Sequence, residues 1–135
     1  MKNFGRSFAL VLAAAFFLCG CAAERSRESK KIIEKDNGRL VELVAGNSLV
    51  IELTGNPSTG YAWETSSTDA SVLKEVKGAA KFKPDTNRIG SPGKVTLLFK
   101  AVGEGRTTLK LVYHRPWEKN IPPIRTYQVA VKVRK

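Results

Sequence analysis

The sequence is poor in the residues that most often carry catalysis or bind metals. It has a single histidine, His114, and two cysteines, Cys19 and Cys21, among 135 residues. A Ser-His-Asp arrangement would have to use His114, and no G-x-S-x-G motif supplies a nucleophile. One histidine without a closely spaced acidic cluster is also too little for a metal site. We therefore expect no enzyme, no metal and no cofactor.

No apolar run is long enough to span a bilayer, which takes about 20 residues. The run from Phe8 to Leu18 instead has the length of a signal-peptide core, and a short basic start precedes it. The following Leu18-Cys19-Gly20-Cys21 resembles a bacterial lipobox, which implies cleavage before Cys21 and lipidation of its thiol. The alternative is an ordinary signal peptide that is cut after Cys21-Ala22-Ala23.

The lipobox resemblance implies how the chain is divided into segments and where in the cell it is located. Residues 1–20 form a lipoprotein signal peptide, residues 21–31 the lipidated Cys21 and a flexible tether with nothing apolar to bury, and residues 32–135 one domain. The folded part then has no thiol, which excludes disulfides and cysteine-based sites. The expected location is the bacterial cell envelope, with a lipid anchor in the membrane, at the outer membrane or facing the periplasm.

Acidic residues are in the minority. There are 12 of them against 23 lysines and arginines, which gives a formal net charge of +11. In an exported protein such a charge favours anionic lipid, surface polyanions or an acidic protein as partner over nucleic acid. One hypothesis is therefore a basic envelope lipoprotein module that binds surface polyanions or another envelope protein. Another is a structural lipoprotein within a larger assembly.

Helical periodicity is absent beyond a few residues, and strand-like alternation replaces it. Ile32-Ile33 and Leu40 to Val44 flank Asp36-Asn37-Gly38, which predicts a turn between two strands. Val72 to Val76 fits a strand or a helical turn, and residues 77–93 have the composition of a loop. The clearest alternating segments are Leu49 to Leu53, Tyr61 to Thr65, Val95 to Ala101, Leu109 to Tyr113 and Tyr127 to Val133.

About seven short strands separated by turns are typical of an all-β, immunoglobulin-like β-sandwich, with a closed barrel as the alternative. In such a sandwich three of the loops lie at one end, and here they comprise residues 55–60, 84–93 and 115–123. All three carry glycine or proline, and the third carries Trp117 close to an arginine. Because tryptophan and arginine dominate interface hot spots, we expect three binding loops at one end.

The loops together resemble the motifs of the chagasin family, inhibitors of papain-like cysteine peptidases. The resemblance spans about residues 38–133 and implies an immunoglobulin-like fold. The family's middle loop typically carries Gly-x-Gly-Gly, whereas Pro92 here removes a backbone N–H donor. The motif residues, which the resemblance makes peptidase-binding, are Asn56-Pro57-Ser58-Thr59-Gly60-Tyr61, Gly90-Ser91-Pro92-Gly93 and Arg115-Pro116-Trp117.

The resemblance implies a monomeric, tight-binding and reversible inhibitor whose three loops block the active-site cleft. The first loop would sit over the peptidase's cysteine-histidine pair while the other two grip either side. Pro57 would stiffen this loop, Asn56 would cap its turn, and Gly60 would allow a positive φ or a close backbone approach. Trp117 would lie on the enzyme, and Arg115 would pair with a carboxylate or orient its loop. The competing interpretation makes the first loop a mere turn and Trp117 a packing residue.

Overall fold

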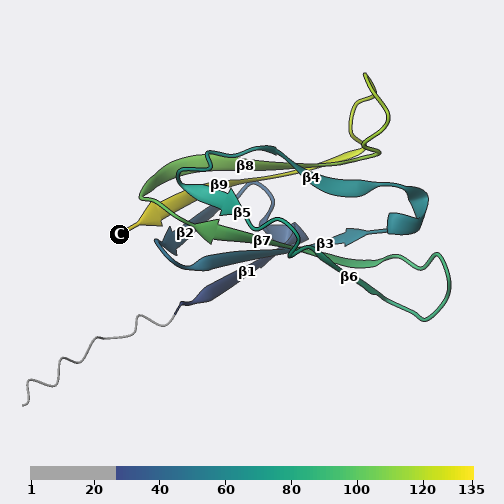
Figure 1. Cartoon of the computed structure of the whole chain (residues 1–135), viewed down its shortest axis with the longest axis horizontal. Coiled ribbons are helices and arrows are strands. Elements are labelled where there is room, and N and C mark those ends of the chain that lie inside the picture. The colour runs from purple at the N-terminus through teal and green to yellow at the C-terminus, as the bar shows by residue number, and fades with distance from the viewer. Residues whose placement is uncertain (1–26) are drawn as a thin grey trace, which may run out of the picture.

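The computed structural model describes residues 27–135, and this part of the chain is built from strands and two single-turn 3-10 helices (Figure 1). The elements are β1 (Ser29–Ile33), η1 (Glu34–Asp36), β2 (Leu40–Val44), β3 (Ser48–Gly55), η2 (Pro57–Thr59), β4 (Ala62–Ser67), β5 (Leu73–Glu75), β6 (Lys81–Pro84), β7 (Gly93–Ala101), β8 (Gly105–His114) and β9 (Arg125–Arg134).

The strands form two sheets that pack face to face. One sheet has five strands in the order β1-β3-β7-β5, with β6 also paired to β7, and the other has four in the order β2-β9-β8-β4. The prediction of an all-β, immunoglobulin-like sandwich is confirmed, and two separate sheets replace the alternative of one closed barrel. Within the described residues there are nine strands rather than about seven.

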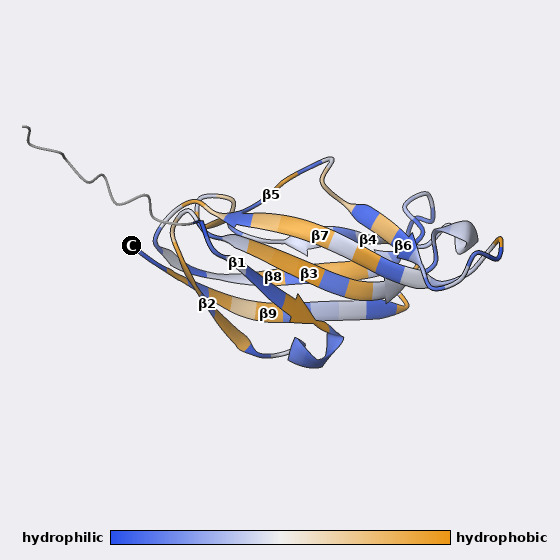
Figure 2. Ribbon diagram, turned by 90° about the horizontal axis from the view of Figure 1, so that it is seen from below, coloured by the Kyte–Doolittle hydropathy of each residue, from blue (hydrophilic) through white to orange (hydrophobic). Residues whose placement is uncertain are grey.

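Alternating side chains of both sheets fill the space between them. Every buried side chain in residues 27–135 is hydrophobic, and Phe99, Leu49 and Leu109 are fully buried. Figure 2 shows the alternation as orange bands that interrupt blue and white ones along the strands. Trp63 and Tyr113 belong to this core, and their ring centres lie 5.0 Å apart. Residues 27–135 contain no cysteine, so the hydrophobic core is stabilised without disulfides.

The predicted turn at Asp36 to Gly38 is present, but the two strands that it connects do not pair with each other. β1 pairs in parallel with β3, whereas β2 pairs in parallel with β9 in the opposite sheet. The segment that contains η1 thus crosses from one layer to the other. β1 also begins at Ser29, three residues inside the segment expected to be a tether, because Ser29 to Lys31 pair with the free edge of β3.

The region expected to be a loop, residues 77–93, contains strand β6. Its residues Lys81 to Pro84 pair with Gly93 to Thr96 of β7. All four β6 residues are exposed, so the strand has no alternation of buried and polar positions by which a sequence could reveal it. The ambiguous segment Val72 to Val76 contains the short strand β5.

Between residues 27 and 135, no helix has the length and apolar character to cross a bilayer.

Candidate functional site

Three loops meet at one end of the sandwich, which we call the loop pole. They connect β3 to β4, β6 to β7, and β8 to β9, and all lie at the right-hand side of Figure 1. Asn56 Nδ2 of the first loop donates to Gly90 O of the second at 3.0 Å. Arg115 Nε of the third donates to Thr59 O of the first at 3.1 Å. The loops therefore form one connected surface, at the common end that the strand count predicts.

The tip of the first loop is a rigid turn. Asn56 is extended, and its Oδ1 accepts hydrogen bonds from Ser58 N at 3.2 Å and Ser58 Oγ at 2.6 Å. Thr59 Oγ1 donates back to Asn56 O at 2.7 Å. Pro57 begins the 3-10 turn and Gly60 ends it with φ = +80°. The expected capping role of Asn56 and the positive φ of Gly60 are both observed, and the turn is fixed before any partner binds.

Trp117 lies on Gly60 with most of its indole in solvent. The side chain is 66% exposed, so the interpretation as a core residue is wrong. A Cβ added to Gly60 would lie 2.2 Å from Trp117 Cη2, which is far inside van der Waals contact. The indole therefore uses space that only a glycine leaves free. An exposed aromatic held in one place is the usual form of an interface anchor.

Arg115 is occupied within the loop pole and orients its loop. Besides its bond to Thr59 O, its Nη1 donates to Glu118 Oε1 at 3.1 Å. Its guanidinium also stacks 4.5 Å from the centre of the Tyr61 ring. Tyr61 in turn stacks on Tyr113, with the ring centres 5.4 Å apart, so it anchors the first loop to the core. In the free protein Arg115 thus pairs with a carboxylate of its own loop and also orients that loop against the first.

The second loop is braced from inside and presents one apolar side chain. Asp85 N donates to Pro92 O at 2.9 Å, and Thr86 Oγ1 donates to Ser91 Oγ at 3.0 Å. Ile89 is fully exposed at 105% of its reference area, although sequence reasoning passed over it. A lone apolar residue in a polar loop produces no periodic signal. Its exposure on a braced loop makes Ile89 a candidate contact residue.

Gly93 differs from the other expected contact residues because it is buried at the start of β7. An added Cβ there would lie 2.1 Å from Lys83 O and 2.6 Å from Pro84 Cα of the neighbouring strand. The glycine therefore permits the close pairing of β6 and β7, and we assign it a structural role.

A polar network supports the root of the first loop, and sequence reasoning missed it. Glu34 Oε1 accepts from Thr54 N at 3.0 Å and pairs with Arg125 Nη2. Thr54 O accepts from Arg125 Nη1 at 2.9 Å and from Trp63 Nε1 at 3.1 Å. The Arg125 guanidinium stacks 5.1 Å from the Trp63 ring centre. Residues 34, 54, 63 and 125 come from four separate elements, so only the folded chain brings them together.

Ionised Glu34 is the form that this network favours. Burial raises the pKa of the carboxyl, but the Thr54 N–H and the hydrogen bond and charge of Arg125 outweigh it, so the pKa lies below its ordinary value. A carboxyl whose pKa is lower in the folded state than in the unfolded state stabilises the fold at pH values above its unfolded-state pKa. This stabilisation is lost as the pH falls through the folded-state pKa.

We therefore expect Glu34→Gln to lower the urea midpoint at pH 7, and to lower it less at pH 3. The neutral amide cannot form the charge pair. At pH 3, below the ordinary carboxyl pKa of 4.5, the unfolded chain is already protonated at this position, so the ionised native form contributes less stability. Urea unfolding at both pH values measures the effect. Glu104→Gln, at an exposed position outside the network, is the control. An equal decrease in the urea midpoint of Glu34→Gln at both pH values would contradict this account.

Catalytic and metal-binding groups do not gather at the loop pole. Within residues 27–135 there is no cluster of three or more His, Cys, Asp or Glu that could hold a metal ion. His114 ends β8, and its Nε2 lies 2.7 Å from Glu64 Oε2. Within the described residues, the loop pole therefore offers a partner its shape and its exposed apolar side chains.

Comparison with known proteins identifies relatives over most of the chain. The family model described as "Chagasin family peptidase inhibitor I42" matches residues 42–131. Amoebiasin-2 from Entamoeba histolytica is 34% identical over 76% of this chain and 84% of its own length. Chagasin from Trypanosoma cruzi is 28% identical over 66% of this chain and 84% of its own length.

A solved structure agrees with these matches. The crystal structure of a cysteine protease inhibitor from Entamoeba histolytica superposes with a TM-score of 0.69 and 30% identity. It covers 79% of this chain and 96% of that protein.

The expected location in a bacterial cell envelope is contradicted by these relatives. They come from Entamoeba histolytica and Trypanosoma cruzi, which are eukaryotes. None of them supports a lipid anchor or membrane partner. Cys21 and the signal peptide of residues 1–20 lie outside the described residues.

Proposed function

The chain belongs to the chagasin family of peptidase inhibitors, and we propose that it is a tight-binding, reversible inhibitor of papain-like cysteine peptidases. The family consists of inhibitors rather than enzymes, so the activity is blockage of a site. The observation that carries the proposal is the direct hydrogen bonding between the three loops, from Asn56 to Gly90 and from Arg115 to Thr59. A free protein that already holds its loops together loses little conformational entropy when it binds.

In the proposed complex the first loop enters the peptidase cleft. Ser58 and Thr59 are small, and Gly60 adds no side chain, so this tip is slim enough for a groove that accepts an extended peptide. The turn at Pro57 to Thr59 is hydrogen-bonded within itself and does not offer an extended segment to the catalytic cysteine. The peptidase thus receives no peptide bond in register for attack, and inhibition leaves the chain intact.

The other two loops contact the walls of the cleft on either side. Trp117 supplies a large, rigid aromatic surface, and Ile89 a smaller apolar one. Pro92 has no N–H to donate, so the second loop contributes through side chains and carbonyl groups. Arg115 holds the first and third loops at a fixed spacing. The comparisons give no support to the alternative, a basic module for surface polyanions or another envelope protein.

Titration against papain tests the proposal. With a fluorogenic peptide substrate we expect complete, competitive inhibition with a dissociation constant below about 1 μM, which corresponds to about 8 kcal/mol of binding free energy. Dilution should restore the activity, and the inhibitor should be recovered uncleaved. A serine peptidase such as chymotrypsin, whose site has a different outline, is the control. Full papain activity in the presence of about 10 μM protein would refute the proposal.

A further inference from the structure

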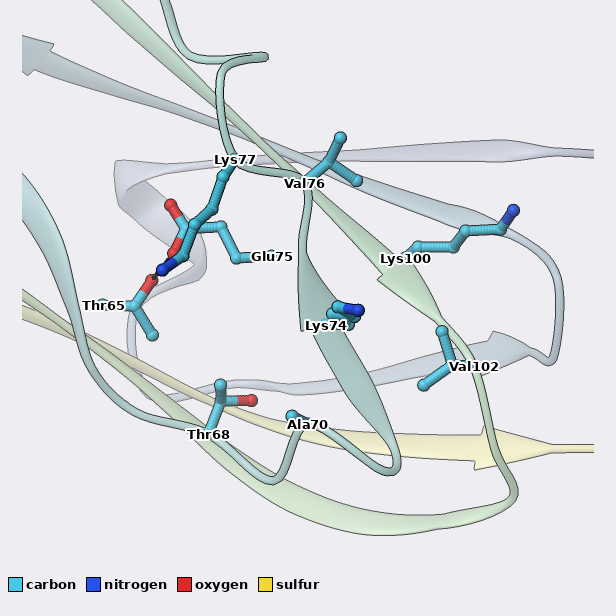
Figure 3. Close-up of a pocket in the computed structure, with 9 residues that line it drawn as sticks. All are labelled: Thr65, Thr68, Ala70, Lys74, Glu75, Val76, Lys77, Lys100 and Val102. Atoms are coloured by element: carbon cyan, nitrogen blue, oxygen red, sulfur yellow. Dashed lines mark hydrogen bonds between the residues drawn. The ribbon is translucent and has the colours of Figure 1, made fainter.

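A second concave site lies away from the loop pole. It is a groove of about 640 Å³ that runs between the edge strands β4 and β5, and its lining residues belong to none of the three loops (Figure 3). Thr65 Oγ1 of one sheet donates to Glu75 Oε2 of the other at 2.9 Å, at one side of the lining (Figure 3). The volume lies within the usual range for small-molecule sites, about 300–1,000 Å³.

The groove exposes apolar side chains that the core leaves uncovered. Val76 is 37% exposed and Val102 is 46% exposed, and Ala70 lies beside them in the lining. Single exposed valines are ordinary on a protein surface, but here they share one concavity. A ligand with an apolar chain would remove both valines from water at once.

The rim of the groove carries positive charge. Lys74 of β5 and Lys100 of β7 are direct cross-strand partners, and Lys77 also lines the groove, against one carboxylate, that of Glu75. Like charges directly opposite each other destabilise a sheet. Within residues 27–135 none of these three lysines lies within 4.0 Å of a carboxylate oxygen, since the ion pairs found there join other residues. An anion placed between Lys74 and Lys100 would relieve their repulsion.

We propose that this groove binds a long-chain fatty acid. Its carboxylate would lie between the Lys74 and Lys100 ammonium groups, and its hydrocarbon chain would cover Val76 and Val102. The cations are lysines, which act as point charges toward a small anionic head group, and no arginine lines the groove to add a bidentate fork. No aromatic residue lines the groove, so it lacks the stacking platform of a single-stranded nucleic acid site.

The chain offers a matched control for the lysine pair. Lys83 of β6 and Lys94 of β7 are also direct cross-strand partners, but they do not line the groove. Replacing either pair by glutamine removes the same charge from the same sheet. Both double variants should fold, since each removes a cross-strand repulsion. A difference in ligand binding between them therefore reports the site rather than the net charge.

Fluorescence titration with cis-parinaric acid, followed by displacement with oleate, tests the proposal on the full chain. We expect saturable binding of one probe per chain, about tenfold weaker in Lys74→Gln/Lys100→Gln and unchanged in Lys83→Gln/Lys94→Gln. Val102→Ser should also weaken binding, while Trp117→Ala, at the loop pole, should not. Absence of saturable binding, equal weakening in both double variants, or equal displacement by methyl oleate would overturn the proposal. Binding confined to anionic phospholipid vesicles would overturn it as well.

Discussion

Gly60→Ala is expected to weaken the inhibition of papain about 10- to 100-fold. Alanine at φ = +80° costs about 1–2 kcal/mol in backbone strain. The larger effect comes from the new Cβ, which would lie 2.2 Å from Trp117 Cη2 and forces the indole off the first loop. Because a displaced hot-spot residue no longer meets its pocket, affinity falls together with stability. Inhibition constants and urea unfolding measure the two effects separately.

The structure provides a control that separates strain from collision. Gly78 also has φ = +80°, but a Cβ there would meet nothing within 4 Å. Gly78→Ala should lose similar stability and leave the inhibition constant unchanged. In the double variant Gly60→Ala/Trp117→Ala the collision is gone, so its affinity should be close to that of Trp117→Ala alone. Equal inhibition by Gly60→Ala and Gly78→Ala would show that the contact between Gly60 and Trp117 is unimportant.

Trp117→Ala is expected to raise the inhibition constant about 100-fold, which corresponds to about 2–3 kcal/mol of binding free energy. The indole is 66% exposed in the free protein, so its loss should leave the free energy of unfolding nearly unchanged. A large change in affinity without a change in stability would distinguish a contact residue from a packing residue. Inhibition assays and urea unfolding on the same preparation provide both values.

Val44→Ala is the matched control for the tryptophan. This valine is also exposed, at 39%, but it lies at the end of β2 opposite the loop pole. Its replacement should leave inhibition unaffected. An inhibition constant for Trp117→Ala within about threefold of the native one, or a similar change in both variants, would remove Trp117 from the proposed contact surface.

The sequence reveals the strands that have one buried and one solvent-facing side. β3, β7, β8 and β9 alternate clearly because every second residue enters the core. Edge strands β1 and β6 lack this signal, since few of their residues are buried. Their pairing is specified by the neighbouring strand, which a local pattern cannot report. The same limit explains why a turn at Asp36 to Gly38 suggests a hairpin although its flanking strands join different sheets.

The candidate site, too, is only partly predictable from the sequence. Counting strands places the three loops at one end, and the roles of Asn56 and Gly60 follow from local backbone chemistry. The hydrogen bonds between loops, the network of Glu34 and the exposure of Ile89 depend on residues far apart in the chain, so they emerge only from the folded structure. The envelope location rested on a short motif around Cys21, outside the described residues, and the relatives contradict it.

The directions of the outer strands decide how the molecule can be attached to something else. β1 starts at Ser29 beside Ser48, and β9 ends at Arg134 beside Val44, both at the end remote from the loops (Figure 1). A carrier protein fused beyond Arg134, or a biosensor chip coupled there, would therefore leave all three loops facing outward. Two such domains joined in tandem by a flexible linker could bind two peptidase molecules at once, because neither domain would sterically block the loop pole of the other.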